Sequence, residues 1–196
     1  MTRARALEVF LRLARLPTLP PPVVEPGFDE AADALLRGER VDLPEARLDF
    51  LRWLGESRGV VFHGSPRNDL VELSTERKSR DSTEWGNQQA VYASSDPVWS
   101  IYFAVLRRDN GWQGTRNGSM GVGGRRFYFF LHNRGSQSPD RFGPGSLYIL
   151  PSETFGRRAV AGRHRAPRLA RPGQAVGPDR RDTRGFPVLR PDRLLP

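Results

Sequence analysis

The pattern of apolar and polar positions changes near Gly59. Before this glycine, apolar residues recur every three or four positions, which is typical of amphipathic helices. Residues 4–16 fit one such helix, a second runs from an N-cap at Asp29 to Leu36, and a third begins at Pro44. The third helix has an apolar face formed by Leu48, Leu51, Trp53 and Leu54.

A proline-rich stretch, residues 17–26, separates the first two predicted helices and holds five prolines. Proline fixes φ and lacks a backbone N–H, so this stretch is incompatible with a helix or a central strand. We expect it to be a stiff linker, because proline-rich spacers are commoner than proline-rich recognition motifs.

After Gly59 the chain is expected to form short strands. Four runs are rich in β-branched and aromatic residues and predict strands, at residues 60–62, 90–93, 127–131 and 146–150. Asp96 followed by Pro97 is typical of an N-cap and a first helical residue, which predicts a helix to about Arg107. The polar residues 67–88 are expected to be a long surface loop. The glycine-rich residues 111–124 are also expected to be a loop, since they precede a strand and lack the Gly-Lys-Ser/Thr of a phosphate cradle.

Length and composition bound the architecture. A chain of 196 residues is long enough for one domain with a substantial core. The absence of cysteine excludes disulfides, thiolate metal ligands and cysteine nucleophiles. We expect no metal site, because His132 has no second histidine at metal-ligand spacing and is interpreted as an ordinary strand-end residue. No apolar run reaches the roughly 20 residues of a membrane span, and the start of the chain lacks the pattern of a secretory signal. A cytoplasmic protein, or an effector exported by another route, is therefore expected.

The positive charge is concentrated in the tail. The chain carries a net charge of +9, of which residues 156–196 contribute +8 through eleven arginines and three aspartates. This tail has one aromatic residue and no periodicity, so we expect it to be mostly disordered. Two alternatives stay open. The tail contacts nucleic acid weakly through its arginines, or it results from an out-of-frame reading of GC-rich sequence.

The candidate chemistry lies at the end of the first predicted strand. His63 and Gly64 follow that strand, and Ser65 completes the segment. A glycine there allows a ligand to approach the backbone, and an imidazole can hydrogen-bond a ribose hydroxyl. Tyr92 on the next strand and Tyr102 on the following helix can form two faces of a slot for a cationic pyridinium ring. A capped turn and two core aromatic residues are the structural alternative for the same positions.

Four blocks of the chain resemble the ADP-ribosyltransferase superfamily, in the histidine–tyrosine–glutamate branch that includes diphtheria-type toxins and poly(ADP-ribose) polymerases. These blocks are Val-Phe-His-Gly-Ser, Ala-Val-Tyr-Ala-Ser, Ile-Tyr-Phe-Ala and Ser-Leu-Tyr-Ile-Leu-Pro, and they span about residues 59–155. The resemblance implies a split antiparallel β-sandwich of α+β class with N-terminal helices. It implies that His63 holds the adenosine ribose of NAD, that the Gly64 backbone, beside Ser65, bonds the nicotinamide carboxamide, and that Tyr92 and Tyr102 stack on the nicotinamide ring.

The chain departs from that family at the third position, the glutamate. Ser146 or Leu147 stands where the resemblance places it. The nearest carboxylate in sequence is Glu153, roughly 20 Å away along an extended strand. Glu84, or Glu72, in the long loop is the other weak candidate for a catalytic carboxylate.

The predicted organisation is therefore helices with a linker in residues 1–58, an ADP-ribosyltransferase-like core in residues 59–155, and the basic tail from residue 156. The leading hypothesis is NAD-dependent transfer of a single ADP-ribose to a protein or nucleic acid, with NAD as substrate and no membrane partner. One alternative is a catalytically inactive module of the same fold that binds a nucleotide or a partner protein. Another is an RNA 2′-phosphotransferase-like enzyme, which needs arginines around the phosphate such as Arg67, Arg77 or Arg80.

Overall fold

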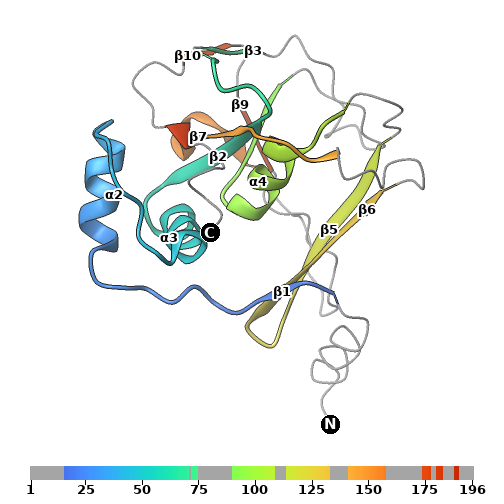
Figure 1. Cartoon of the computed structure of the whole chain (residues 1–196), viewed down its shortest axis with the longest axis horizontal. Coiled ribbons are helices and arrows are strands. Elements are labelled where there is room, and N and C mark those ends of the chain that lie inside the picture. Colours follow the sequence, from blue (N-terminus) through green and yellow to red (C-terminus); the bar gives the residue numbers. More distant parts are fainter. Residues whose placement is uncertain are drawn as a thin grey trace.

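A six-stranded antiparallel sheet forms the centre of the computed structural model (Figure 1). The structure describes residues 16–70, 72–74, 90–108, 114–132, 141–157, 174–177, 180–182 and 188–189. The strand order in this sheet is β11-β7-β2-β4-β9-β8. The strands are β2 (Val60–Ser65), β4 (Val91–Ser94), β7 (Ser146–Pro151), β8 (Gly156–Arg157), β9 (Gln174–Gly177) and β11 (Val188–Leu189).

Strands β2 and β7 form the longest pair of the sheet. They align in antiparallel register from Val60 opposite Pro151 to Ser65 opposite Ser146, which places His63 opposite Tyr148. Directly opposed residues of an antiparallel pair share one face of the sheet, and successive residues alternate between the faces. His63 and Tyr148 therefore lie on one face, together with Val61.

The two faces of the sheet bury different apolar clusters. Helices α2 (Phe28–Leu36) and α3 (Arg47–Ser57) contribute their apolar sides to a cluster with alternate residues of β2 and β7. That cluster contains Phe28, Ala32, Leu35, Phe50, Leu51, Leu54, Val60, Phe62, Leu147 and Ile149. The opposite face packs against β3 (Glu72–Ser74) and Phe155 in a second, smaller cluster. The sheet is therefore covered on both faces, with α2 and α3 on one of them.

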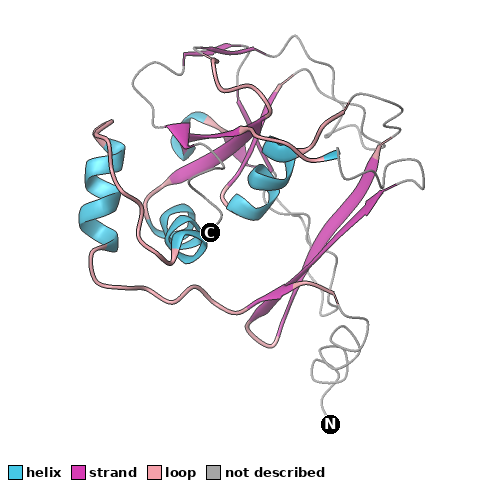
Figure 2. Cartoon of the chain, in the orientation of Figure 1, coloured by secondary structure: helices cyan, strands magenta, loops and turns pink. Residues whose placement is uncertain are grey.

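A long hairpin lies apart from the six-stranded sheet (Figure 2). It consists of β5 (Thr115–Val122) and β6 (Arg125–His132), and β1 (Thr18–Leu19) pairs with the outer edge of β6. Gly123 and Gly124 join the two long strands, both with positive φ, 58° and 75°. Two successive residues with positive φ make the type I′ turn that suits a two-residue hairpin.

The third helix, α4 (Pro97–Val105), packs against β2 and β7 and carries some residues of the candidate site. The Asp96 side chain accepts a hydrogen bond from the Val98 N–H, and Pro97 is the first helical residue. The predicted N-cap and helix start are thus confirmed. The helix ends at Val105, two residues before the predicted end.

The observed helices and antiparallel sheets confirm the α+β class. Several individual elements differ from the prediction. Residues 115–122, expected to be a loop, form β5, because β6 supplies a continuous antiparallel partner for this glycine-containing segment. Thr18 and Leu19, inside the expected linker, form β1 at a sheet edge, where flanking prolines are tolerated. Strand β2 is longer than the predicted 60–62 and continues through His63 and Gly64 to Ser65.

The helix starts also differ from the prediction. The N-cap of α2 is Gly27, and Asp29 lies in the first turn, where its negative charge interacts favourably with the helix dipole. Helix α3 begins at Arg47 instead of Pro44, and its most buried aromatic residue is Phe50. The helix predicted for residues 4–16 lies outside the described residues, apart from Leu16.

Segments of the predicted loop and tail also form strands. Glu72–Ser74, inside the expected loop 67–88, pair as β3 with β10 (Arg180–Asp182). In the tail, which was expected to be disordered, β8 and β9 extend the main sheet from β4 and β11 pairs with β7. Backbone pairing to existing sheet edges explains strand formation in segments whose own composition does not predict it. No helix of the described residues has the length and apolarity needed to cross a membrane.

Candidate functional site

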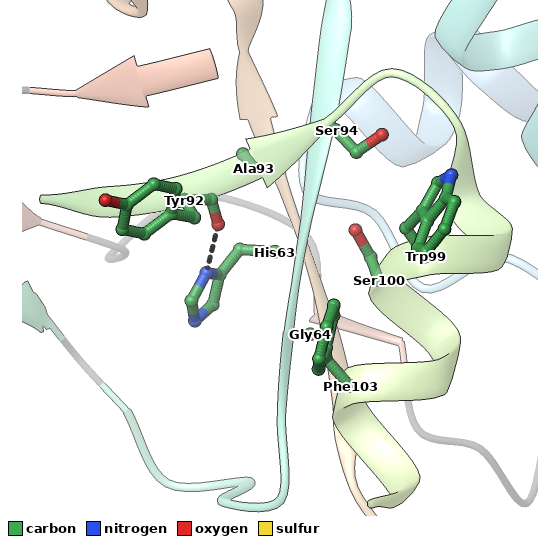
Figure 3. Close-up of a pocket in the computed structure, with 8 residues that line it drawn as sticks. All are labelled: His63, Gly64, Tyr92, Ala93, Ser94, Trp99, Ser100 and Phe103. Carbon is green, nitrogen blue, oxygen red and sulfur yellow. Dashed lines mark hydrogen bonds between the residues drawn. The ribbon is translucent and has the colours of Figure 1, made fainter. Parts of the chain in front are cut away.

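A hollow of about 100 Å³ lies between β2, β4 and helix α4 (Figure 3). Strands β2 and β4 are in register at Phe62 and Ser94, and the hollow lies beside this point. The residues that line it are His63, Gly64, Tyr92, Ala93, Ser94, Trp99, Ser100 and Phe103. The structure therefore brings together three of the predicted binding residues, His63, Gly64 and Tyr92, from two different strands.

His63 is held by a hydrogen bond across the two strands. Its Nδ1 lies 2.8 Å from the carbonyl oxygen of Tyr92, as Figure 3 shows. A carbonyl oxygen only accepts, so Nδ1 carries the proton and donates. In the neutral ring Nε2 is then an acceptor. In this tautomer Nε2 is the ring nitrogen with the chemistry to accept a hydrogen bond from a hydroxyl group, such as that of a ribose.

Gly64 is required by packing. A Cβ at this position would overlap the carbonyl oxygen of Ser100 and would lie 2.7 Å from its carbonyl carbon and 2.8 Å from the Ala104 nitrogen. All three atoms belong to the backbone of α4, which cannot yield as a flexible side chain would. The space left by the missing side chain is therefore filled by α4, whereas the sequence suggested that it gives access to a ligand.

Gly145, directly before β7, is required for the same reason. A Cβ there would overlap the carbonyl oxygen of Ala104 and lie 2.8 Å from the Ser65 oxygen. The two glycines let consecutive turns of α4 rest directly on the β2–β7 pair. This contact fixes how far the helix, and with it Trp99, Ser100 and Phe103, stands from His63.

Three aromatic residues line the hollow besides His63, namely Tyr92, Trp99 and Phe103. The predicted second wall, Tyr102, does not line it. The Tyr102 side chain is 8% exposed, stacks on Phe130 at 4.1 Å between ring centroids, and donates a hydrogen bond to the Thr115 hydroxyl. This burial raises the pKa of Tyr102. Tyr102 therefore attaches α4 to the β5–β6 hairpin, and its neighbour Phe103 faces the hollow.

Two serines near the hollow have defined partners. Ser100, which the sequence analysis missed, donates from its hydroxyl to the Phe62 carbonyl oxygen at 2.6 Å. The predicted Ser65 does not line the hollow; its buried hydroxyl accepts from the Arg67 N–H at 3.2 Å, which stabilises the chain where it leaves β2. Ser65 is therefore placed as a turn residue, which was the structural alternative for this position.

Asp96 fixes the N-terminal end of α4. Besides capping the helix through Oδ1, it accepts at Oδ2 from the Tyr128 hydroxyl at 2.9 Å and from Arg126 at 3.2 Å. Burial, followed by the nearby Asp96 carboxylate, raises the pKa of Tyr128. Both Asp96 oxygens are thus engaged in structural contacts, so this nearby carboxylate is not placed for chemistry on a ligand.

The predicted catalytic carboxylates do not reach the hollow in the described residues. Glu153 is exposed on the short 3-10 helix Ser152–Thr154, past the end of β7 that lies opposite Val60. Ser146, at the position the resemblance gives to glutamate, is fully buried. Glu84 lies outside the described residues, and for Glu72 the structure describes the strand position in β3 and not the side chain.

Of the three arginines named for the phosphotransferase alternative, the structure describes Arg67, which does not line the hollow. Arg67 is exposed and forms an ion pair with Asp69 at 2.9 Å. Arg77 and Arg80 lie outside the described residues. Among the residues that the structure describes, no group of three or more His, Asp or Glu side chains is arranged to hold a metal ion.

Comparison of the chain with protein-family models, with curated proteins and with solved structures gave no match. The case for a function therefore depends on the geometry of the hollow and on the sequence resemblance.

Proposed function

We propose that the hollow binds the nicotinamide ring of NAD and that the chain transfers a single ADP-ribose from NAD to a macromolecular acceptor. The observation that carries this proposal is the convergence of His63, Gly64 and Tyr92 on one hollow, which Trp99 and Phe103 also line. In this proposal the six-stranded sheet and the β5–β6 hairpin correspond to the two halves of a split antiparallel sandwich of ADP-ribosyltransferase type.

The size of the hollow supports a ligand that enters with one ring. Sites for whole drug-sized ligands measure about 300–1000 Å³, whereas this hollow measures about 100 Å³. A nicotinamide ring would occupy it, and the ribose hydroxyls would lie at its edge, where His63 Nε2 accepts. Apolar walls and a few polar groups are the usual composition of such a site.

The proposed reaction breaks the glycosidic bond between the ribose C1′ and the pyridinium nitrogen. The electron pair of that bond moves to the ring nitrogen, so nicotinamide leaves as a neutral molecule. A nucleophile of the acceptor bonds to C1′ and loses its proton. Tyr92 and Phe103 would hold the ring during this step, and the His63 imidazole would fix the ribose orientation.

A second candidate, a binding module without catalysis, is favoured by one observation. None of the eight described residues that line the hollow carries a carboxylate. A carboxylate beside C1′ would stabilise the positive charge that develops there in the transition state. The same hollow without that group would still bind a nucleotide.

Two measurements on the full chain test these candidates. Titration calorimetry with NAD measures binding, and chromatographic detection of free nicotinamide measures cleavage. Binding with nicotinamide release supports the transferase, and binding without release supports the module. Absence of NAD binding at millimolar concentration, by protein shown to be folded by circular dichroism, contradicts both.

A further inference from the structure

A cationic side chain lies over the ring of Phe103, outside the hollow. The Cζ atom of Arg108 lies 5.2 Å from the centroid of that ring, which is within the range of a cation–π contact. Arg108 is exposed and is not among the residues that line the hollow. Phe103 therefore contacts both the Arg108 guanidinium and whatever occupies the hollow.

This arrangement changes what Phe103 offers to a ligand ring. An aromatic face attracts cations through its quadrupole, and here one cation already lies over the ring. A second ring stacked on the other face of Phe103 at about 3.5 Å would lie about 9 Å from the guanidinium. If that second ring is a pyridinium, the two positive charges repel each other, whereas a neutral ring of the same shape is unaffected.

We infer that Arg108 is a specificity-determining residue that makes the hollow favour neutral heteroaromatic rings over pyridinium cations. This inference rests on the proposed function, in which the ring changes from a cation in NAD to neutral nicotinamide when the glycosidic bond breaks. Arg108 then raises the free energy of the bound pyridinium relative to the neutral leaving group. The effect acts through the field at the ring and needs no contact between Arg108 and the ligand.

The expected size follows from Coulomb's law. Two unit charges about 9 Å apart change an equilibrium constant by about twofold in bulk water and about twentyfold at the effective dielectric constant of a protein surface. We therefore expect Arg108 to weaken binding of a cationic ring by about two- to twentyfold. Added salt should reduce this factor, because the guanidinium is exposed.

The test uses two ligands that differ in charge and lack phosphates. These are nicotinamide and its ring-methylated pyridinium form, titrated by NMR against the full chain. Arg108→Gln removes the charge, Arg108→Lys retains it, and Arg40→Gln is a matched control at an exposed arginine between α2 and α3. We expect Arg108→Gln to tighten binding of the cation by about two- to twentyfold and to change nicotinamide binding by less than about twofold. Arg108→Lys and Arg40→Gln should keep the wild-type ratio of the two affinities.

Two results would overturn the inference. A ratio of the two affinities that Arg108→Gln does not alter would show that Arg108 does not distinguish the two ligands. Weaker binding of the cation in Arg108→Gln would show that Arg108 does not repel it. In both cases binding of the two ligands by the wild-type chain leaves the proposed function standing. If the folded wild-type chain binds neither NAD, nicotinamide nor the methylated cation, both the inference about Arg108 and the proposed function fail.

Discussion

Gly55, in helix α3, is a position where local propensity and tertiary packing predict opposite effects. Alanine is more favourable than glycine inside a helix by about 1 kcal/mol, so propensity alone predicts that Gly55→Ala stabilises the protein. The structure indicates the reverse. A Cβ at Gly55 would overlap the Ser95 carbonyl oxygen, and it would lie 2.8 Å from Cε2 of the Phe62 ring and 3.1 Å from the Ser95 carbonyl carbon.

The magnitude follows from what would have to move. Ser95 precedes the N-cap of α4, and its carbonyl belongs to the backbone. The Phe62 ring is fully buried in the core cluster between the sheet and the helices. Neither group can move aside without shifting an element, and overpacking of this kind costs about 1–3 kcal/mol or more. We expect Gly55→Ala to lower the free energy of unfolding by about 1–3 kcal/mol, and the Tm by about 2–12 °C in a chain of this size.

Urea unfolding followed by circular dichroism measures this change. Gly121→Ala is the matched control, because Gly121 is exposed on β5 and an added Cβ would meet no atom within 4 Å. This control should change stability by less than about 0.5 kcal/mol. A Gly55→Ala protein as stable as the wild type, or more stable, would refute the close approach of α3 to the segment before α4.

Phe103→Ala should weaken NAD binding by about three- to tenfold, because one aromatic wall is lost. Tyr102→Phe should leave binding within about twofold and reduce stability by about 1 kcal/mol through its lost hydrogen bond; calorimetry showing the opposite order would contradict the assignment of the wall. Asp96→Ala should lower the free energy of unfolding by about 2–4 kcal/mol, since it removes the cap and a buried acceptor, and Asp96→Asn should recover some of this loss in urea unfolding. Because its pKa is raised, Tyr128 keeps its proton in the folded state at a pH, about 10, where a tyrosine of the unfolded chain ionises. The free energy of unfolding is therefore unaffected by this group below about pH 10 and falls above it by up to about 1.4 kcal/mol per pH unit. Tyr128→Phe should make this decline less steep above about pH 10, and parallel curves for the wild type and the variant would contradict the raised pKa of Tyr128.

Patterns within short stretches predicted the elements that hold the site. The run Val60–Phe62 predicted strand β2, and the pair Asp96-Pro97 predicted the start of α4 with its cap. These predictions succeed because the signals are local: β-branched residues favour strands, and aspartate before proline satisfies the first turn of a helix. Three residues of the proposed ring site, His63, Gly64 and Tyr92, were predicted from such strands, whereas Phe103 was not.

Glycine-rich segments were predicted less well. Residues 115–122 lack the composition of a strand, yet they pair along their whole length with β6. Gly118 fits there because the Phe129 ring lies over it: a Cβ would overlap two atoms of that ring. Such a cross-strand contact depends on a partner that is known only after folding, so the composition of the segment itself predicts a loop.

Local sequence patterns could not predict whether Tyr102 or Phe103 lines the hollow, for a geometric reason. Tyr102 and Phe103 are consecutive on α4, and consecutive helical residues point about 100° apart. Which of them faces the hollow depends on the rotation of the helix about its axis. That rotation is set by contacts from distant segments of the chain, namely Gly64, Gly145 and the Asp96 carboxylate with its partners on β6.

The position of Phe103 at the hollow, where Tyr102 was predicted, has a consequence for the proposed function. Two phenol rings would give a pyridinium two electron-rich faces, whereas Phe103 presents a face already polarised by Arg108. We expect a hollow built in this way to bind the cationic ring of NAD less strongly than a hollow whose walls carry no neighbouring charge would. If the chain cleaves NAD, some of the driving force lies in the ring's loss of positive charge beside Arg108. In both cases the same charge should make nicotinamide a better ligand than its ring-methylated pyridinium form, and release of nicotinamide from NAD distinguishes the two cases.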